Sequence, residues 1–419
     1  MRIAYSAVVP IRIGTTAGFL IPVTLLWLGA LSARAEYFYV ATNGAGGDFK
    51  DWTRAATNIQ EAVNVATNGD TVLVSNGVYT TATPFVHITT TLTSTSTVFL
   101  SNNITLKSVN GPAVTVIDAT NYPTMTARVV FVRSGATLNG FTIRNGNVKR
   151  PFCNGDLHGG GIWANSGNLI VTNCFIYNNT ADSGYGGGIS VRGATNIVAN
   201  CMIYSNNAYS SGGMDVQWTY SNLIVNCVFY GNRAISSTGG ALGLWNTYSI
   251  VRNCLFYNNI SAEQGGGIVN LSVGWSPTFE NCTIVSNRAT KEGGGLYIAD
   301  TSGDARARNL IIYNNSTGRN FADAFTTNMS ILTNCCIRDT NGVQNWNTSG
   351  NITNNPLFVN KDVDNYHLTE ISPCFNTGTN QTSWMSTGVD LDSKARIRYG
   401  RVDMGAYERI RSGTAYGFH

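Results

Sequence analysis

Apolar and polar residues alternate along most of the chain in short runs that are bounded by glycine or asparagine. The segments 168–174 and 222–227 show this pattern well. A period of two is typical of β-strands, because successive side chains of a strand point to opposite faces. The pattern therefore predicts short strands rather than helices.

A seven-residue motif, Asn-Cys-x-(Ile/Phe)-Tyr-x-Asn, repeats through the centre of the chain. Complete or variant copies begin at Asn173, Asn200, Asn226, Asn253, Asn281, Asn309 and Asn334. Their second residues are 25 to 28 positions apart, a spacing that marks a solenoid. Glycine runs keep the same register and begin at Gly159, Gly186, Gly212, Gly239, Gly265 and Gly293. The two motifs predict a parallel β-helix, in which equivalent strands of successive coils stack into parallel sheets.

The rest of the chain divides around this solenoid, and we expect one all-β domain with caps at both ends. Residues 1–35 have the features of a signal peptide: basic residues, an apolar stretch and a small-x-small cleavage sequence. A retained membrane anchor is the alternative, and no later segment is apolar enough to cross a membrane. The expected segments are a signal peptide at 1–35, an N-terminal cap at 36–69 with a helix near 59–66, roughly ten coils at 70–340, a C-terminal cap at 341–408 and a tail at 409–419.

Each position of the motif is expected to have its own place in a coil. The repeated cysteines would stack as a buried column of thiols, with Cys acting as a small apolar residue. This column comprises Cys174, Cys201, Cys227, Cys254 and Cys282. Columns that begin at Asn173 and Asn179 would mark turns, because Asn tolerates left-handed backbone and its amides can bond along a stack. The cysteines outside the column are Cys153, Cys335, Cys336 and Cys374, of which one pair could be oxidised.

The charge of the chain argues against nucleic acid as a partner. Residues 1–35 hold three arginines and no acids, so the remainder carries 24 basic and 23 acidic residues. Nucleic-acid binding would require a basic surface. A net charge near zero also argues mildly against a polyanionic substrate. We expect a monomer.

Three segments resemble known protein families. Residues 59–79 resemble the entry helix and first coil of the pectin-lyase-like superfamily of right-handed parallel β-helix proteins. Glycine runs with motifs such as Phe256-Tyr-Asn-Asn259 are similar to the repeats of polymorphic outer-membrane proteins. Residues 355–358, 372–373 and 401–408 resemble the C-terminal module called choice-of-anchor Q. The resemblance implies a right-handed coil and export to the cell surface or the medium, as in bacterial exported proteins.

The resemblance leaves activity open, because this superfamily includes polysaccharide lyases, glycoside hydrolases, esterases and non-enzymatic adhesins. The sequence lacks the signatures of polygalacturonase-like hydrolases, pectate lyases and pectin esterases. We therefore predict non-enzymatic adhesion or recognition of a polysaccharide or cell-surface glycan. The alternative is a carbohydrate-active enzyme, a lyase or hydrolase acting on a polysaccharide.

Aromatic columns are the first candidate for a glycan-binding site. If Cys and Ile/Phe of the motif face inward, the Tyr position faces outward, where its rings would form a strip suited to stacking on sugars. The candidate residues are Tyr177, Tyr204, Tyr230, Tyr257, Tyr313, Trp218 and Trp245. A purely structural ladder is the competing interpretation, because aromatic pairs stabilise sheets by themselves.

A rim of acidic residues before the glycine runs is the candidate for catalysis. It carries His158, Asp182, Glu263 and Glu292, which could supply an acid/base pair or hold Ca²⁺. Solvated turn charges are the competing interpretation. No cysteine and histidine spacing typical of a metal site occurs, so no metal or cofactor is otherwise expected.

Overall fold

The fold is taken from a computed structural model of the chain. It describes residues 34–81, 83–86, 93–121, 127–149, 157–193, 195–272, 274–299, 305–318, 323–326, 331–343, 350–380 and 383–409. The predictions made for residues 1–33, for Cys153 and for residues 410–419 lie outside these ranges.

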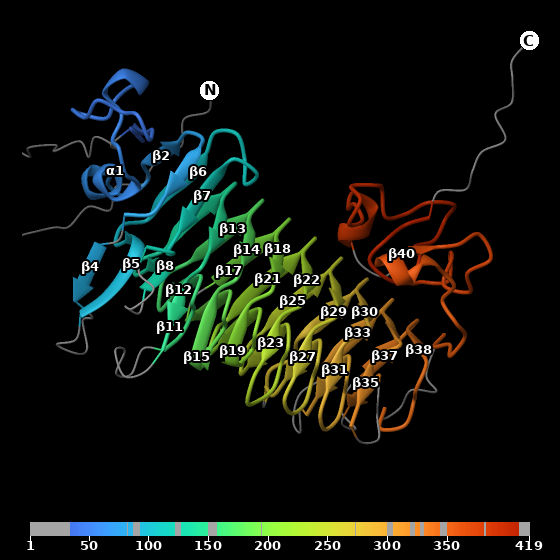
Figure 1. Cartoon of the computed structure of the whole chain (residues 1–419). Helices are drawn as coiled ribbons and strands as arrows, with labels where there is room; N and C mark the ends of the chain where they lie inside the picture. The colour runs from blue at the N-terminus through green and yellow to red at the C-terminus, as the bar shows by residue number, and fades with distance from the viewer. Residues whose placement is uncertain are drawn as a thin grey trace, which may run out of the picture. The chain divides into compact units, whose positions relative to one another are not determined.

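The described chain winds into a parallel β-helix, as the motif spacing predicts (Figure 1). The first sheet has eleven strands: β1 (Tyr37–Val40), β2 (Thr71–Val74), β6 (Ile104–Ser108), β9 (Ala136–Asn139), β13 (Leu169–Thr172), β17 (Thr195–Ala199), β21 (Ser221–Val225), β25 (Ser249–Arg252), β29 (Thr278–Glu280), β33 (Arg306–Arg308) and β37 (Ile331–Thr333). The second has ten: β3 (Gly77–Tyr79), β7 (Thr115–Asp118), β10 (Thr142–Arg144), β14 (Phe175–Tyr177), β18 (Met202–Tyr204), β22 (Val228–Tyr230), β26 (Leu255–Tyr257), β30 (Thr283–Val285), β34 (Ile311–Tyr313) and β38 (Cys336–Ile337).

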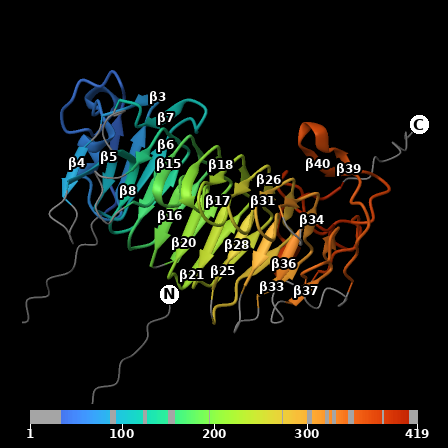
Figure 2. The same ribbon diagram turned by 60° about the horizontal axis from the view of Figure 1, so that its bottom comes forward.

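The third sheet contains two stacks of strands, which we call the long column and the short column (Figure 2). The long column consists of β5 (Thr93–Leu100), β8 (Ala127–Val132), β12 (Ile162–Ala164), β16 (Ile189–Arg192), β20 (Met214–Gln217), β24 (Leu242–Trp245), β28 (Ile268–Asn270), β32 (Leu296–Ile298) and β36 (Ala324–Thr326). The short column consists of β11 (Asn147–Val148), β15 (Thr180–Tyr185), β19 (Asn207–Ser210), β23 (Arg233–Ala234), β27 (Ile260–Ser261), β31 (Arg288–Ala289) and β35 (Ser316–Thr317). At one end β4 (Thr83–Val86) pairs antiparallel with β5.

One continuous apolar core fills the inside of the coils from Phe38 to Val343. Because the strands are parallel and in register, equivalent side chains stack directly, as do the rings of Phe229 and Phe256 at 4.8 Å. The inward residues of each strand are buried, and the residues between them face out. This alternation is the physical basis of the period of two in the sequence.

Six cysteines share one column position within this core, one more than the sequence predicts, with Leu310 between the fifth and the sixth. They are Cys174, Cys201, Cys227, Cys254, Cys282 and Cys335, each no more than 1% exposed. Each thiol donates to the carbonyl oxygen two residues earlier, at 3.1–3.4 Å. Placing Cys335 outside the column was wrong, because strand alternation turns Cys335 inward and the next residue, Cys336, outward.

The first asparagine of each motif makes the turn between the first and second sheets. Asn173 has φ +55°, and its equivalents have φ between +50° and +54°. This is the left-handed conformation that Asn tolerates better than most residues. The predicted role of this asparagine as a turn residue is therefore confirmed.

The second asparagine of each motif forms a buried ladder. Its members are Asn179, Asn206, Asn232, Asn259, Asn287 and Asn315, all 0–1% exposed. Asn179 Oδ1 accepts from Gly146 N at 2.9 Å. The Oδ1 of each later member accepts from both the backbone N and the Nδ2 of the preceding member, at 2.9–3.1 Å. The ladder ends at the carboxylate of Asp323, which Arg338 pairs at 3.1 Å.

Helix α1 (Ile59–Val65) packs at the N-terminal end of the coils, as predicted. The Asn58 side chain accepts from Glu61 N at 3.0 Å and caps its first turn. The face formed by Ile59, Ala62 and Val63 is buried.

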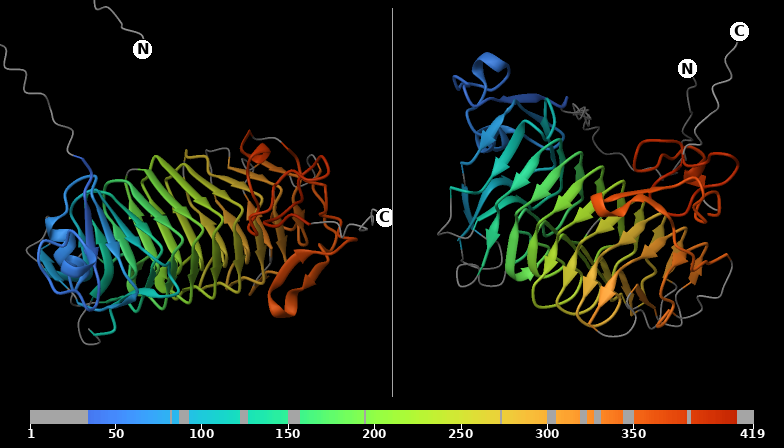
Figure 3. Two further views of the ribbon diagram at one scale, coloured as in Figure 1. Left: turned by 90° about the horizontal axis from the view of Figure 1, so that it is seen from above. Right: turned by 45° about the vertical axis from the view of Figure 1, so that its right-hand side comes forward.

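The C-terminal segment was expected to cover the far end of the coils, but much of it lies beside them (Figures 1 and 3). Asn253 Nδ2 donates to Val389 O at 2.5 Å, and Ala406 N donates to Thr283 Oγ1 at 3.0 Å. Only the start of the segment continues the coils, where Ile352 N donates to Cys335 O at 2.9 Å. The segment also contains the hairpin of β39 (Phe358–Asn360) and β40 (Asn365–Leu368) and three-residue or four-residue 3₁₀ turns at Lys361–Val363 and Ser383–Ser386.

Candidate functional site

The outward face of the long column carries a line of stacked residues, one from each strand from β8 to β36. From the N-terminal side the line runs Phe131, Trp163, Ser190, Asp215, Gly243, Val269, Tyr297 and Phe325. Aromatic rings occupy both ends of this line, where Phe99 stacks on Phe131 at 5.6 Å and Tyr297 stacks on Phe325 at 4.9 Å. Polar or absent side chains interrupt it at Ser190, Asp215 and Gly243, which we call the polar gap.

Asp215 lies at the centre of the polar gap and is fully buried. Its Oδ1 accepts from Ser211 Oγ at 3.0 Å and from Trp245 Nε1 at 2.8 Å, and its Oδ2 accepts from Ser190 Oγ at 3.2 Å. Burial raises the pKa of Asp215 to about 7, against the opposing effect of these donors and of Arg192. A carboxyl group with such a pKa can take up and release a proton near neutral pH.

Two departures from the glycine pattern create this environment. Ser211 occupies the place that Gly186 has one coil earlier, with φ +58°, so a non-glycine residue holds a left-handed conformation there. Gly243 leaves room for its hydroxyl, because a Cβ at Gly243 would lie 2.0 Å from Ser211 Oγ and 2.9 Å from Trp245 Nε1. This coil therefore departs from the packing of its neighbours at two positions, and as a result hydrogen-bond donors surround one carboxyl group.

A cationic group borders the polar gap. Arg192 Nε donates to Gln217 Oε1 at 2.9 Å, and the two residues are register partners on β16 and β20. Arg192 Nη2 lies 3.1 Å from His158 Nε2. Since Arg only donates, Nε2 must accept, and the proton of a neutral His158 sits on Nδ1.

His158 is buried between the rings of Trp163 and Tyr185, at 4.9 and 5.2 Å. Burial, followed by the charges of Arg192 and Arg128, lowers the pKa of His158 to about 3. The imidazole is therefore neutral at physiological pH. It positions Arg192 and does not exchange protons.

Of the predicted acidic rim, only His158 lies at the polar gap. Asp182 is exposed on β15, and Glu263 forms an ion pair with Lys291 at 2.8 Å that is more than one third exposed. Glu292 lies near Tyr297, whose pKa is raised by burial and then by this carboxylate. The rim residues therefore do not form one cluster, because turns on successive coils hold them apart.

The tyrosine column exists, but its geometry differs from the flat strip expected for sugar stacking. Tyr177, Tyr204, Tyr230 and Tyr257 stack at 4.6–5.1 Å, with interplanar angles of 4–17°. The ring faces therefore contact one another, and only edges and hydroxyl groups point outward. Stacking of sugars on these faces is excluded while the column is intact.

The C-terminal segment covers the far part of the tyrosine column. Tyr366 packs on Tyr257 at 5.5 Å, and Tyr313 lies in an apolar cluster with Phe358 beneath the same segment. Tyr177, Tyr204 and Tyr230 remain half-exposed.

The two candidate tryptophans lie at the edge of the polar gap. Trp245 is half-buried and donates to Asp215, whereas Trp218 is 62% exposed, with its N donating to Trp245 O at 3.0 Å. Beyond them Trp275 packs against Tyr220 at 5.8 Å and Tyr248 at 4.6 Å, each at 53°. Tyr220 is 74% and Tyr248 47% exposed, so Trp218, Tyr220, Tyr248 and Trp275 form an exposed aromatic patch.

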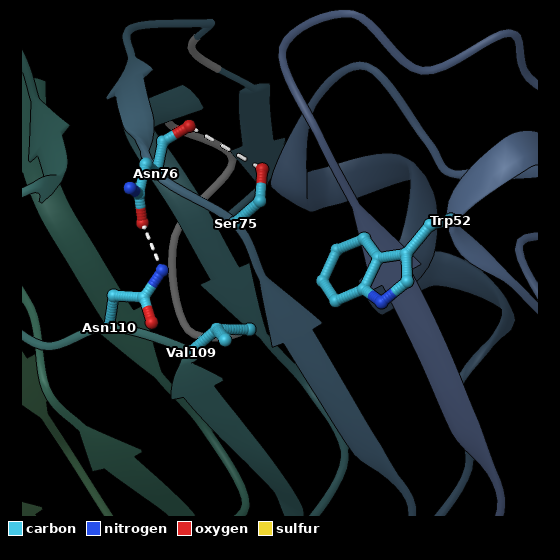
Figure 4. Close-up of a pocket in the computed structure, with 5 residues that line it drawn as sticks. All are labelled: Trp52, Ser75, Asn76, Val109 and Asn110. Carbon is cyan, nitrogen blue, oxygen red and sulfur yellow. Dashed lines mark hydrogen bonds between the residues drawn. The ribbon is translucent and has the colours of Figure 1, made fainter.

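A separate pocket of about 270 Å³ lies at the N-terminal coils (Figure 4). Trp52, Ser75, Asn76, Val109 and Asn110 line it, and Asn110 Nδ2 donates to Asn76 Oδ1 at 2.9 Å. No titratable side chain lines this pocket, so the polar gap is the better candidate for catalysis. Within the described ranges, no three His, Cys, Asp or Glu side chains are placed to hold a metal ion, and no helix among them is long and apolar enough to span a membrane.

The sequence analysis missed Asp215, Ser211 and Arg192. A signal for Asp215 was present, because Trp163, Ser190, Asp215 and Gly243 each follow the apolar residue that ends a glycine run. Aligning the coils on that residue places the four in one line. The hydrogen bonds of Ser211 had no such signal, since they depend on its left-handed backbone.

Comparison with known proteins supports the fold. No family model matches the chain, and no curated protein does. The solved structure of pectate lyase Pel9A is similar over 90% of this chain and 97% of its own, with a TM-score of 0.53 and 14% identity. A rhamnogalacturonan lyase aligns over 83% of this chain and 97% of its own, with a TM-score of 0.43 and 12% identity. The first likeness confirms the predicted right-handed, pectate-lyase-like β-helix fold.

Proposed function

We propose that this chain cleaves a uronic-acid-containing polysaccharide by β-elimination at the polar gap. This proposal adopts the alternative given in the sequence analysis, a carbohydrate-active enzyme, in place of the main prediction of non-enzymatic adhesion or glycan recognition. The observation that carries it is Asp215, a buried carboxyl group with a pKa near 7 beside Arg192. Pectate lyase Pel9A, the solved structure whose fold this chain shares, is a lyase, which supports the same direction.

Elimination requires one base and one cation. Asp215 takes the proton from the carbon next to the substrate carboxylate, while Arg192 pairs with that carboxylate and stabilises the charge that develops on it. The electron pair forms a carbon–carbon double bond and expels the oxygen of the neighbouring sugar. That oxygen takes a proton from water, and Asp215 releases its own to solvent.

Hydrolysis fits the site less well. Glycoside hydrolysis ordinarily uses two carboxyl groups on either side of the bond. Among the described residues, the hydrogen-bond partners of Asp215 are Ser190, Ser211 and Trp245, with no second carboxyl group. The near-zero net charge of residues 36–419 is offset locally, because Arg133 lies over the ring of Phe99 and Arg192 over the ring of Trp163 on the long column.

For the substrate to reach Asp215, the Trp245 indole that covers this carboxyl group must move. Asp215 is enclosed by Ser211 and by the Trp245 indole, whose Nε1 bond spans 2.8 Å. Rotation of the half-buried indole opens the carboxyl group. The adjoining aromatic patch then offers exposed ring faces on which neighbouring sugars can stack.

The test is to incubate the purified chain with polyuronides and with neutral glycans, each with and without Ca²⁺. We expect ultraviolet-absorbing unsaturated ends from a polyuronide in the wild type, and their loss in Asp215→Asn. Glu263→Gln, in an ion pair outside the gap, is the matched control. New reducing ends without unsaturation would favour hydrolysis, and no cleavage of any glycan would overturn the enzymatic proposal.

Glycan recognition without cleavage is the second candidate. It is favoured by the half-exposed Tyr177, Tyr204 and Tyr230, whose hydroxyl groups form a regular row. Co-sedimentation with a polysaccharide that survives Tyr204→Ala with Tyr230→Ala would eliminate this row as the binding surface. The same proposal includes export through residues 1–35 and placement at the cell surface or outside the cell. It also includes the resemblances to polymorphic outer-membrane proteins and to the choice-of-anchor Q module. All of these predictions rest on the sequence alone.

A further inference from the structure

Two adjacent cysteines at the last described coil face different environments. Cys335 points into the core, where its thiol donates to Thr333 O at 3.4 Å and lies 3.6 Å from Ala307 O. Cys336 points outward, because successive residues of a strand alternate. It therefore leaves the thiol column and meets the C-terminal segment.

Cys336 and Cys374 belong to one small buried cluster between the coil and that segment. The other members are Ile311, Leu368 and Met404, and both cysteines are 0% exposed. Cys374 is held in place by its backbone, with N donating to Ser372 Oγ at 3.2 Å and O accepting from Met404 N at 3.0 Å. The two thiols are close enough to share a hydrogen bond.

The geometry of this pair differs from that of the thiol column. In the column, side chains of parallel in-register strands point the same way. The Cys336 thiol, like the column thiols, donates to a carbonyl oxygen, that of Asn354 at 3.1 Å, but it also meets a thiol from another segment of the chain. Cys336 projects from the coil and Cys374 projects toward it from the covering segment. A disulfide requires two Cβ atoms that approach each other in this way.

We propose that Cys336 and Cys374 form a disulfide bond that fastens the C-terminal segment to the side of the coils. With an oxidant of the glutathione disulfide class, one thiolate attacks the oxidant, releases one glutathione and forms a mixed disulfide. The second thiolate then attacks the protein sulfur and releases the second glutathione. The chain loses two hydrogens, and the two electrons reduce the oxidant.

The bond is expected to form before the segment closes. The hydrogen bond with Cys374, followed by burial, raises the pKa of Cys336 well above its usual value, so the closed pair holds little thiolate. Once formed, the bond closes a loop between residues 336 and 374. It holds in place the same segment that covers Tyr257 and Tyr313.

The experiment is to refold the full chain in a glutathione redox buffer, block free thiols under denaturing conditions and map disulfide-linked peptides by mass spectrometry. We expect one linkage, between the peptides of Cys336 and Cys374, with the six column thiols blocked. Free Cys336 and Cys374 after oxidative refolding, or a linkage to any other cysteine, would overturn the proposal. This measurement uses the wild-type chain, so it does not depend on a variant that folds.

Limited proteolysis tests the consequence. Reduction, Cys336→Ser and Cys374→Ser should each speed cleavage within residues 350–409 on the order of tenfold or more, because the segment can then open locally. Cys335→Ala is the matched control, and the disulfide bond between Cys336 and Cys374 should persist in this variant. Equal cleavage rates for oxidised and reduced wild type would contradict the fastening role. Polysaccharide cleavage is measured separately, so failure of this inference leaves the proposed function standing.

Discussion

The two asparagines of each motif should differ strongly in how much stability their substitution costs, and the coil around Asn232 gives the clearest test. Asn232 is fully buried. Its Nδ2 donates to Ile203 O at 2.8 Å and to Asn259 Oδ1 at 3.0 Å. Its Oδ1 accepts from the backbone N and the Nδ2 of Asn206, at 3.1 and 3.0 Å. Asn232→Ala removes all four bonds from a site closed to water.

The magnitude follows from this bond count. A net contribution of about 1 kcal/mol per hydrogen bond gives about 4 kcal/mol, with a range of roughly 2–6 kcal/mol that depends on how many partners stay unsatisfied. The backbone N of Asn206 is the most costly case, because its acceptor is the deleted Oδ1. We expect the free energy of unfolding to fall by that amount.

Asn226→Gly in the same motif is the matched control. Asn226 has φ +53° and is half-buried; its Nδ2 donates to Asn200 Oδ1 and its Oδ1 accepts from Asn253 Nδ2, both at a longer 3.2 Å. Glycine adopts this backbone without strain, which offsets part of the loss of these two contacts, so we expect a change of about 1 kcal/mol, well below that of Asn232→Ala. Urea unfolding followed by circular dichroism and by intrinsic fluorescence measures both variants. A loss below about 1 kcal/mol for Asn232→Ala, or equal losses for the two variants, would refute the assignment of the ladder as the stabilising element.

Three further predictions concern the polar gap and the C-terminal segment. Because the pKa of Asp215 is raised from its usual 3.8 to about 7, the folded state holds its proton more tightly, so the contribution of Asp215 to stability is greatest below pH 4 and is lost as pH rises through about 7. Asp215→Asn should remove this loss, raising stability above pH 7 by on the order of 2–4 kcal/mol in chemical unfolding, while cleavage is abolished; an unchanged pH profile would contradict the raised pKa. Gly243→Ala should cost about 1–3 kcal/mol and most activity, because its Cβ would meet Ser211 Oγ at 2.0 Å. Gly193→Ala, whose Cβ would meet no atom within 4 Å but whose φ is +66°, should cost about 1–2 kcal/mol of backbone strain and leave activity intact; equal kcat values in the two variants would count against the prediction. Trp384→Phe removes the 2.9 Å bond to Glu280 and should speed proteolysis of the C-terminal segment several-fold without changing cleavage of polysaccharide.

Repetition explains why so much of the fold could be predicted. Each of the motif's positions recurs in the same environment, so Asn173 could be recognised as a turn residue and Cys174 as a core residue from their spacing alone. The error at Cys335 arose where the motif is truncated and two cysteines are adjacent. Only the inward or outward direction of the strand distinguishes them, and the sequence near residue 335 leaves that direction ambiguous.

The tyrosine column shows a different limit. Period-two alternation correctly placed Tyr204 outside the core, but it carries no information on ring orientation. Stacking at 4.6 Å with Tyr230 turns the ring faces toward each other and leaves hydroxyl groups outward. The cover over Tyr257 could not be predicted from the repeat either, because it comes from Tyr366, more than 100 residues later in the chain.

The polar gap is best understood by comparing it with the coils on either side. Apolar side chains at positions 190, 215 and 243 would continue the line from Trp163 to Val269 without burying a carboxyl group. Asp215 instead makes the fold less stable as pH rises through 7, the same range in which ionisation makes it a better base. Stability and the proposed activity should therefore change in opposite directions across this range. If Asp215 were only structural, no activity would rise as stability falls. If Asp215 is the catalytic base, both changes are required, because the same ionisation lowers stability and creates the base.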